Sequence, residues 1–299
     1  MMVASFAKNA EGIWQYKEDF DELCEYPNQH SETLAKGTFV QGHYPEGWYA
    51  CSSGNKLPDG ISEVTWGTFN YFRIGEGSHT GSGLYNFGAG NPAVKSKNST
   101  YRSLGSLNDA SNRSIMYGVL IENNTGQQIQ LLDVAYTGKV WRVGTSSTAI
   151  DTLKFEYVVL NQQTLLRQLR DRQKFLGDVR VRAMDDLNFV TPSAMTATTE
   201  GTVASKIDGD NDANQTHLFA TLPVAVNPGE VVLLRWTDVD EQGEDQALAI
   251  DDLVVTATIE GQGVDNIQKS AANYRKYLRN GQVIIVKDNI EYTVLGNRL

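Results

Sequence analysis

The feature that most constrains this chain is a long series of short apolar runs over residues 14–259, each broken by glycine, asparagine, aspartate or serine. The runs are rich in β-branched and aromatic residues, which favour strands. The chain has 27 glycines against 7 prolines, a ratio that suits many tight turns. Almost no helical pattern separates the runs, so the sequence predicts an all-β, two-layer antiparallel sandwich. The clearest runs are 115–122, 129–136, 153–160, 231–237 and 248–259.

Two local patterns lie between these runs. Residues 164–176 place leucines near helical spacing with basic residues between them, which predicts a short amphipathic helix or an elongated hairpin. Its basic side is either a solvated face or a docking surface for an acidic protein. Residues 123–126 (NNTG) combine two asparagines with a glycine, a signal for a hairpin between the runs on either side.

The composition changes at both ends of the expected sandwich. Residues 260–273 are polar and are interpreted as a linker. Residues 274–299 contain three short strand-like runs with asparagine-containing turns, which predicts a small, separate β-hairpin tail. Residues 1–13 form an N-terminal segment, interpreted either as the remnant of a signal peptide or as a disordered start.

Charge and hydropathy argue against two kinds of partner. The formal net charge is −10, so a surface that binds the phosphates of nucleic acid is not expected. No run approaches the roughly eighteen consecutive apolar residues of a transmembrane helix. Cys24 and Cys51 are either a disulfide, in an exported protein, or two buried thiols. Two cysteines without a CxxC spacing are too few for a zinc site.

Short motifs within residues 14–259 resemble a jelly-roll domain of bacterial exported proteins. The opening pair of motifs, 20–21 (FD) and 47–48 (GW), and the closing motif 249–252 (AIDD) are similar to those of MAM and concanavalin-A-like lectin domains. The resemblance implies a jelly-roll sandwich and says little about the ligand. The other motifs that carry it are 84–88 (LYNFG), 102–107 (RSLGSL), 136–142 (YTGKVWR), 155–157 (FEY) and 233–238 (LLRWTD).

The tail resembles the C-terminal sorting tails of type IX secretion substrates. Residues 278–283 (LRNGQV) and 292–299 (YTVLGNRL) are similar to the hairpin of those tails that directs export to the cell surface. Asn289 stands in place of the usual glycine and Asn297 in place of the usual glutamine. The resemblance implies a secreted protein, or one on the outer surface of a Gram-negative bacterium. The alternative is a hairpin that merely packs on the sandwich.

The jelly-roll resemblance also implies a structural Ca²⁺ between the first and last strands, because strand ends supply several hard oxygens together. In the alternative interpretation these carboxylates bond to loop amides or lie in solvent. The residues implied by motif are Glu18, Asp19 and Asp21 with Asp251 and Asp252. Residues 206–214 (KIDGDNDAN) begin like an EF-hand loop but lack its glycine and final glutamate, so an acidic turn is expected there.

Aromatic side chains are common contacts in sugar-binding sites, because a flat ring stacks on the face of a pyranose. Six residues beside predicted loops are candidates for contact with a ligand, with burial in the core as the alternative. They are Trp48, Tyr49, Trp66, Tyr71, Tyr101 and Arg102. Trp141 and Trp236 lie within strand-like runs and are assigned to the core.

The sequence contains no recognised catalytic motif. Gly-x-Ser-x-Gly, Walker and HExxH motifs are missing, and the acidic runs 18–22 and 238–241 lack the Glu-x-Asp-x-Glu alternation of sandwich glycosidases. We therefore expect a non-catalytic, secreted or surface module that binds a glycan or a surface protein. The alternatives are a polysaccharide hydrolase and a purely structural surface component. Two carboxylates about 5–10 Å apart in an aromatic-lined groove would favour the hydrolase.

Overall fold

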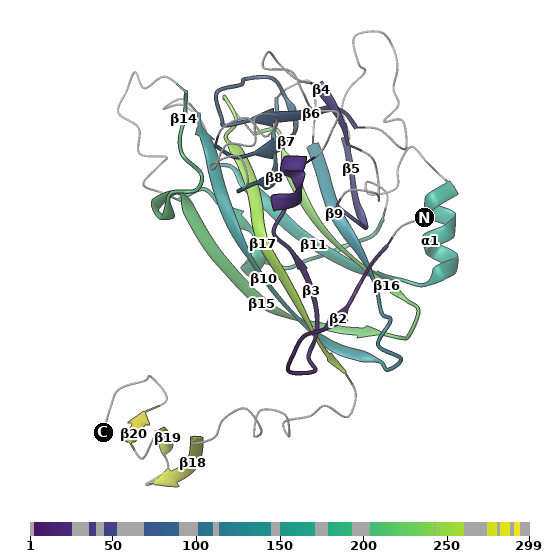
Figure 1. The fold of residues 1–299 in the computed structure, drawn as a ribbon, viewed down its shortest axis with the longest axis vertical. Helices are drawn as coiled ribbons and strands as arrows, with labels where there is room; N and C mark the ends of the chain where they lie inside the picture. The colour runs from purple at the N-terminus through teal and green to yellow at the C-terminus, as the bar shows by residue number, and fades with distance from the viewer. Residues whose placement is uncertain are drawn as a thin grey trace. The chain divides into compact units, whose positions relative to one another are not determined.

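The computed structural model describes most of the chain, and nearly all of that part is β-structure (Figure 1). The residues described are 3–25, 36–39, 45–52, 69–89, 101–109, 114–144, 150–170, 179–192, 204–241, 243–259, 274–279, 282–287 and 290–293. The chain divides into two compact units, Met1–Thr258 and Ile259–Leu299. Within the described ranges, no helix has the length and apolar character needed to cross a bilayer.

The first unit contains two sheets. The first sheet has seven strands in the described residues: β1 (Ala4–Ser5), β5 (Trp48–Ser52), β9 (Ser114–Glu122), β11 (Thr152–Leu160), β12 (Arg182–Ala183), β13 (Phe189–Val190) and β16 (Val231–Val239). β16 pairs antiparallel with β9 on one side and with β11 on the other. The free side of β9 pairs with β5 and, in parallel, with β1.

The second sheet has ten strands in the same part of the chain. They are β2 (Ala7–Lys8), β3 (Trp14–Glu18), β4 (Lys36–Phe39), β6 (Phe69–Gly75), β7 (Gly83–Phe87), β8 (Ser103–Leu107), β10 (Ile129–Val143), β14 (Ser205–Lys206), β15 (Gln215–Val226) and β17 (Ala247–Ile259). β17 lies beside β10 and exchanges partners along its length, pairing with β8 at 248–250 and with β3 at 253–257. β6 and β7 run parallel.

Aromatic residues from both sheets fill the space between the two layers. Trp236 of β16 lies at the centre, with its ring stacked 5.7 Å from Trp48 and 6.4 Å from Tyr117. Tyr136 of the second sheet and Phe155 of the first meet the same ring edge-on at 5.5 and 5.3 Å. The predicted all-β fold class, a two-layer jelly-roll sandwich, is confirmed.

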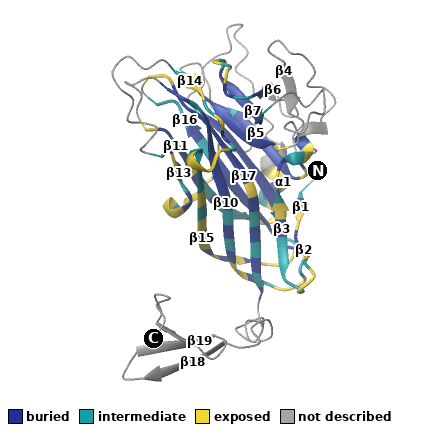
Figure 2. Cartoon of the chain, turned by 60° about the vertical axis from the view of Figure 1, so that its left-hand side comes forward, coloured by how far each residue is buried: buried dark blue, intermediate teal, exposed yellow. Residues whose placement is uncertain are grey.

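The strand pattern explains why the sheets close face to face. β15 alternates exposed or intermediate residues with buried ones from Ala220 to Val226, and Figure 2 shows the matching alternation of colour along β15 and β10. Such alternation with a period of two places one face of a strand against the core and the other in solvent. Trp141 and Trp236 are both buried, as the sequence predicted.

Helical elements are few in the described residues: α1 (Gln162–Arg170) and the 3-10 turns η1 (Asp21–Glu25), η3 (Asp185–Leu187) and η4 (Asp212–Asn214). The helix α1 overlaps residues 164–176, the stretch expected to be an amphipathic helix or a hairpin. It buries Leu165 against the first sheet and leaves Leu166 half-exposed. The acidic turn expected at residues 206–214 contains η4.

Two expectations about the sandwich need correction. Residues 123–126 do not form a hairpin, because β9 belongs to the first sheet and β10 to the second, so this turn crosses between layers. The Asn123 side-chain amide fixes the crossing by donating to the carbonyls of Gln127 and Val226. Residues 1–13 were set apart from the sandwich, yet β1 and β2 add strands to both sheets, and Ala4 and Phe6 are buried.

The second unit is a three-stranded antiparallel meander. Its strands are β18 (Tyr274–Arg279), β19 (Gln282–Lys287) and β20 (Ile290–Thr293). These strands match the three strand-like runs of the tail. The predicted linker, residues 260–273, lies outside the described residues.

Deleting residues 264–299 is expected to leave the melting temperature of the sandwich nearly unchanged. The last strand of the sandwich, β17, ends at Ile259, and the meander pairs its three strands with one another. Thermal unfolding of the full chain and of the truncated chain measures the difference. A fall of many degrees would show that the tail contributes to the sandwich core.

Candidate functional site

The candidate site begins where β3 ends. Phe20 follows β3 with a left-handed φ of 56°, which turns the chain away from the sheet and into η1. The Glu18 carboxylate accepts a hydrogen bond from the Phe20 amide at 2.9 Å, and the Asp19 carboxylate accepts one from the Asp21 amide at 3.1 Å. The Phe20 ring packs edge-on against Trp48, with centroids 5.0 Å apart, so the turn is anchored in the core.

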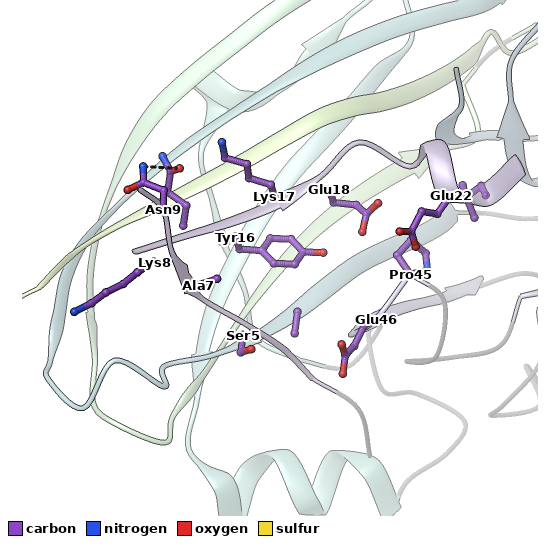
Figure 3. Close-up of a pocket in the computed structure, with 13 residues that line it drawn as sticks. Ser5, Ala7, Lys8, Asn9, Tyr16, Lys17, Glu18, Glu22, Pro45 and Glu46 are labelled. Carbon is purple, nitrogen blue, oxygen red and sulfur yellow. Dashed lines mark hydrogen bonds between the residues drawn. The ribbon is translucent and has the colours of Figure 1, made fainter. Parts of the chain in front are cut away.

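A pocket of about 660 Å³ opens beside this turn (Figure 3). Its size lies within the range of small-molecule sites. Four chain segments, 4–9, 15–18, 22–23 and 45–46, supply its walls. Most of its lining side chains carry hydrogen-bonding groups: Ser5, Lys8, Asn9, Gln15, Tyr16, Lys17, Glu18, Glu22 and Glu46.

Tyr16 forms the inner wall of the pocket. Its ring is 8% exposed, and its hydroxyl accepts a hydrogen bond of 2.8 Å from the Trp48 indole N–H. Figure 3 shows the hydroxyl pointing toward the side of the pocket that holds Glu18 and Pro45. Burial raises the pKa of Tyr16 well above its usual range, and Glu18 adds to that rise. Tyr16 therefore stays a neutral phenol at physiological pH.

Glu46 reaches the pocket through a close approach of two backbone segments. The next residue, Gly47, has a left-handed φ of 80°. A Cβ at this position would overlap the Ala4 amide nitrogen and come within 2.9 Å of the Leu120 carbonyl oxygen. Because only glycine fits this position without strain, it lets β1 lie against the start of β5 and places Glu46 across from β3.

Burial is the main cause that raises the proton affinity of Glu18. Burial raises the pKa of Glu18 to about 7, the hydrogen bond from Phe20 opposes the rise, and Asp19 and Glu22 add to it. Glu18 thus titrates near neutral pH. Among the described residues, no lysine, arginine or histidine forms an ion pair with Glu18, Glu22 or Glu46.

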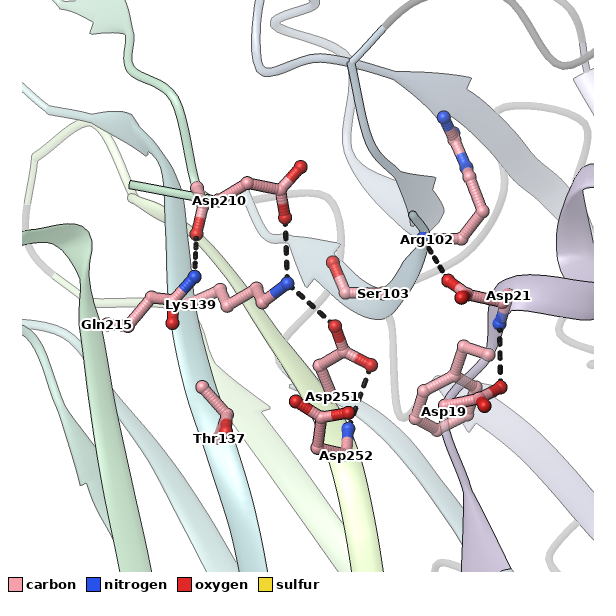
Figure 4. A network of polar contacts seen from close by, with 12 residues as sticks. Asp19, Asp21, Arg102, Ser103, Thr137, Lys139, Asp210, Gln215, Asp251 and Asp252 are labelled. Carbon is pink, nitrogen blue, oxygen red and sulfur yellow. Dashed lines mark hydrogen bonds and ion pairs between the residues drawn. The ribbon is translucent and has the colours of Figure 1, made fainter. Parts of the chain in front are cut away.

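A second polar cluster, centred on Lys139, lies where β17 exchanges its partner strands (Figure 4). The Lys139 ammonium of β10 is 2.6 Å from the Asp251 carboxylate and 2.7 Å from that of Asp210. Lys139 and Asp251 are both buried. Burial opposes the charge of Lys139, but its two carboxylate partners raise its pKa above the ordinary value. The cluster is therefore a buried ion-pair network.

Of the four aspartates predicted to bind calcium, Asp251 belongs to this cluster and Asp252 follows it, whereas Asp19 and Asp21 lie together after β3. Asp251 accepts from the Asp252 amide, and Asp252 has a left-handed φ of 50°. Asp21 accepts from the Arg102 amide at 2.9 Å. With Asp19 bonded to the Asp21 amide, three of the four carboxylates bond to backbone amides, as the alternative interpretation expected.

The calcium site at these side chains stays a prediction. No group of three histidine, cysteine, aspartate or glutamate side chains in the described residues is arranged to hold a metal ion. The Lys139 ammonium also forms an ion pair with the Asp251 carboxylate. A lysine ammonium and a calcium ion at this distance would repel each other, so Lys139 and Ca²⁺ would compete for the Asp251 carboxylate.

Removal of calcium tests whether Lys139 or Ca²⁺ supplies the positive charge beside the Asp251 carboxylate. We expect a chelator to leave the melting temperature unchanged in protein first incubated with Ca²⁺, because Lys139 already supplies the positive charge. A chelator-induced fall of several degrees, abolished by Asp252→Ala, would instead support the calcium site. A fall of several degrees corresponds to the stabilisation that a bound ion would give, about 2.7 kcal/mol at a hundredfold excess over Kd.

The aromatic candidates fall into three groups. Trp48 and Tyr49 are buried in the core, and Arg102 is fully buried with its guanidinium donating to Asn86, so none presents a surface to a ligand here. Tyr101 is 64% exposed. Trp66 and the side chain of Tyr71 lie outside the described residues, as does the side chain of Cys24, so contact with a ligand and the disulfide stay predictions.

Sequence reasoning missed several groups at these two places. Tyr16 and Glu46 adjoin the predicted candidates Glu18 and Trp48, but no local signal indicates that they face one another. Lys139 lies in the 136–142 motif (YTGKVWR), directly before the buried residues Val140 and Trp141. A buried lysine demands a buried anion, but the motif resemblance implied that Asp251 is a calcium ligand, and no signal in the sequence paired it with Lys139.

Comparisons with known proteins identify no family. No protein-family model and no curated protein matches the chain. It is similar to the enzymatically active domain of tailspike protein 4 of bacteriophage CBA120, with 10% identity and a TM-score of 0.31 over 77% of this chain and 21% of that one. The chain therefore spans about a fifth of the length of that tailspike chain.

Two smaller domains are also similar. The CBM22-1 xylan-binding domain of Paenibacillus barcinonensis Xyn10C has 11% identity and a TM-score of 0.25, over 61% of this chain and 88% of that one. The K2 cleaved adhesin domain of Lys-gingipain has 13% identity and a TM-score of 0.28, over 82% and 98%. At TM-scores this low, the likeness carries no argument about function.

Proposed function

We propose that the chain is a non-catalytic glycan-binding module and that the pocket beside β3 is its binding site. The observation that carries the proposal is the lining of this pocket: carboxylates, amides, amines and hydroxyls from four chain segments converge on about 660 Å³. A sugar presents many hydroxyls in fixed directions, and a site that hydrogen-bonds them rejects ligands that lack them.

The pocket is suited to polar recognition more than to stacking. Tyr16 is its only aromatic lining residue among those described, and its ring is largely covered. Glu18 and Glu46 accept hydrogen bonds, whereas Asn9 and Gln15 both donate and accept. Hydrogen bonds to charged groups contribute about 1.5–3 kcal/mol each, more than bonds between neutral groups.

The test is a glycan-array screen of the full chain, followed by titration of the best ligand against variants. Glu18→Gln and Tyr16→Phe are each expected to weaken binding about tenfold, because each removes one hydrogen-bonding contact of the pocket. Tyr101→Ala, which changes an exposed ring outside the pocket, serves as the control. Loss of binding in Tyr101→Ala alone would place the site at the predicted aromatic loop instead.

One observation favours the hydrolase as a second candidate. Glu18 has a pKa of about 7 and shares the pocket with Glu22 and Glu46, and a general acid of glycoside hydrolysis needs a raised pKa beside a second carboxylate. Incubation of the array ligand with wild-type protein should release no reducing ends. Release that disappears in Glu18→Gln would assign the chain to the hydrolases.

We also propose that the protein is exported and held at the outer surface of a Gram-negative bacterium. The tail motifs at 278–283 and 292–299 support this proposal through their resemblance to type IX sorting tails. A reporter protein carrying residues 260–299 should reach the surface of a bacterium that has a type IX system. Retention of that reporter inside the cell would contradict it.

A further inference from the structure

Three aspartates outside both the pocket and the Lys139 cluster lie together in the core, at one end of the sandwich. Asp151 directly precedes β11, Asp238 is the penultimate residue of β16, and Asp245 lies two residues before β17. Asp238 pairs with Leu153, two residues after Asp151, and the Gln246 amide donates to the Asp151 carboxylate. The three aspartates, here called the buried trio, are 3%, 4% and 5% exposed.

Hydrogen bonds within the described residues do not satisfy all the carboxyl oxygens of the buried trio. The donors are the Gln246 amide for Asp151, the Ser106 hydroxyl for Asp238 at 2.5 Å and the Glu241 amide for Asp245 at 3.3 Å. Asp151 Oδ1 and Asp245 Oδ2 are nevertheless buried without a partner. An unpartnered oxygen is far more costly to bury on an ionised carboxylate than on a neutral carboxyl group. The geometry therefore favours protonated carboxyl groups in the folded state.

The charges nearest the buried trio are also negative. Asp240 and Glu241, which follow β16, raise the proton affinity of the trio, and its members raise that of one another. Tyr117 of β9 faces Asp238, and burial holds the pKa of its phenol well above the usual range, so it stays neutral. Among the described residues, no lysine, arginine or histidine forms an ion pair with the trio, whereas the buried Asp251 has an ammonium at 2.6 Å. Like charges this close in the core destabilise one another, so the folded state favours fewer ionised carboxyl groups.

We propose that the buried trio is a proton-dependent latch, which holds the start of β11, the end of β16 and the start of β17 together while its carboxyl groups are protonated, and opens this end of the sandwich when they ionise. Burial raises the pKa of Asp151 and of Asp238 to about 7 and that of Asp245 to about 8, from the usual 3.8, and the neighbouring carboxylates add to the rise. The closed form therefore binds these protons more tightly than the open form. Its stabilisation is complete below the usual pKa and is lost as pH rises through the raised values.

Hydrogen exchange of the full chain between pH 5 and pH 9 tests the latch, with residues 238–248 as the reporter and residues 132–136 of β10 as the reference. After correction for intrinsic exchange rates, the opening constant of the reporter should rise about tenfold per pH unit for each proton released. The reference should open less than the reporter. Asp238→Asn has no proton to release, so its opening constant should rise about tenfold less per pH unit than that of wild type. Asp186→Asn makes the same change at an exposed aspartate outside the trio and should match wild type.

Infrared spectroscopy at pH 6 gives a second measurement, which does not depend on opening. The absorption of protonated carboxyl groups should be weaker in Asp238→Asn than in wild type and unchanged in Asp186→Asn. Where Asp238→Asn does not fold, Asp245→Asn replaces it in both measurements. Equal pH slopes, or equal infrared absorption, in wild type and the trio variant overturn the latch. Equal opening of the reporter and the reference at every pH also overturns it, because the trio would then stabilise the whole sandwich and not this end.

Discussion

Replacing Lys139 with methionine is expected to lower the free energy of unfolding of the sandwich by about 3–5 kcal/mol, the usual cost of breaking a buried ion pair. Lys139 lies 2.6 Å from Asp251, and their side chains are 7% and 8% exposed. Methionine keeps most of the aliphatic stem, so the change removes charge more than volume. Urea unfolding at pH 7 measures the loss.

The loss of stability in Lys139→Met should depend on pH. Burial raises the pKa of Asp251 above its unfolded value, Lys139 offsets part of that rise, and the neighbouring Asp252 adds to it. A carboxyl whose pKa is raised in the folded state binds protons more readily there than in the unfolded state. Its contribution to stability therefore falls as pH rises from the usual pKa of 3.8 to the folded pKa of about 7. Without Lys139 the pKa of Asp251 rises further. The difference in free energy of unfolding between Lys139→Met and the wild type should therefore widen from pH 5 to pH 8.

Lys206→Met is the matched control. Lys206 forms an ion pair of nearly the same length with Glu76, 2.7 Å against 2.6 Å, but its two side chains are 54% and 46% exposed. Exposed pairs contribute at most about 1 kcal/mol, because water screens them. Equal losses in the two variants would show that burial of the Lys139 cluster is not what makes it stabilising.

Trp236→Ala is expected to have an effect of similar size, about 3–5 kcal/mol, because it opens a cavity between the two sheets. The ring is fully buried and contacts Trp48, Tyr117, Tyr136 and Phe155. Where the alanine variant fails to fold, Trp236→Phe keeps an aromatic ring and should lose less. Urea unfolding followed by circular dichroism measures both variants.

Phe219→Ala is the control for the loss of an aromatic side chain. Phe219 lies on β15 opposite Ala135 and is 63% exposed. Little apolar area is buried there, so the expected change lies within about 0.5 kcal/mol. A loss as large as that of Trp236→Ala would mean that the outer face of β15 is covered by another part of the protein.

The fold class and the strand positions were decided by the sequence, because both depend on local pattern. The alternation of exposed and buried residues along β15 is written in the order of its side chains, whichever strand lies beside it. The strand-like runs of the tail became β18, β19 and β20 for the same reason. Of the residues that line the pocket, the motif resemblance singled out only Glu18, and it did so as a calcium ligand.

Pairing between distant segments was decided only in the tertiary structure. The NNTG turn has the sequence signal of a hairpin, yet β9 pairs with β16 more than a hundred residues away, and the turn crosses between sheets. Trp48 flanks a predicted loop, but pairing of β5 with β9 turns its ring into the core. The pocket exists because β1 pairs with β9 and brings residues 4–9 beside Glu46, and the ammonium of Lys139 finds Asp251 because β10 lies beside β17. A residue's neighbours in the chain determine its backbone preference. Its electrostatic partners and its burial depend instead on contacts between distant segments, which close long loops. Such contacts cannot be predicted from the local sequence.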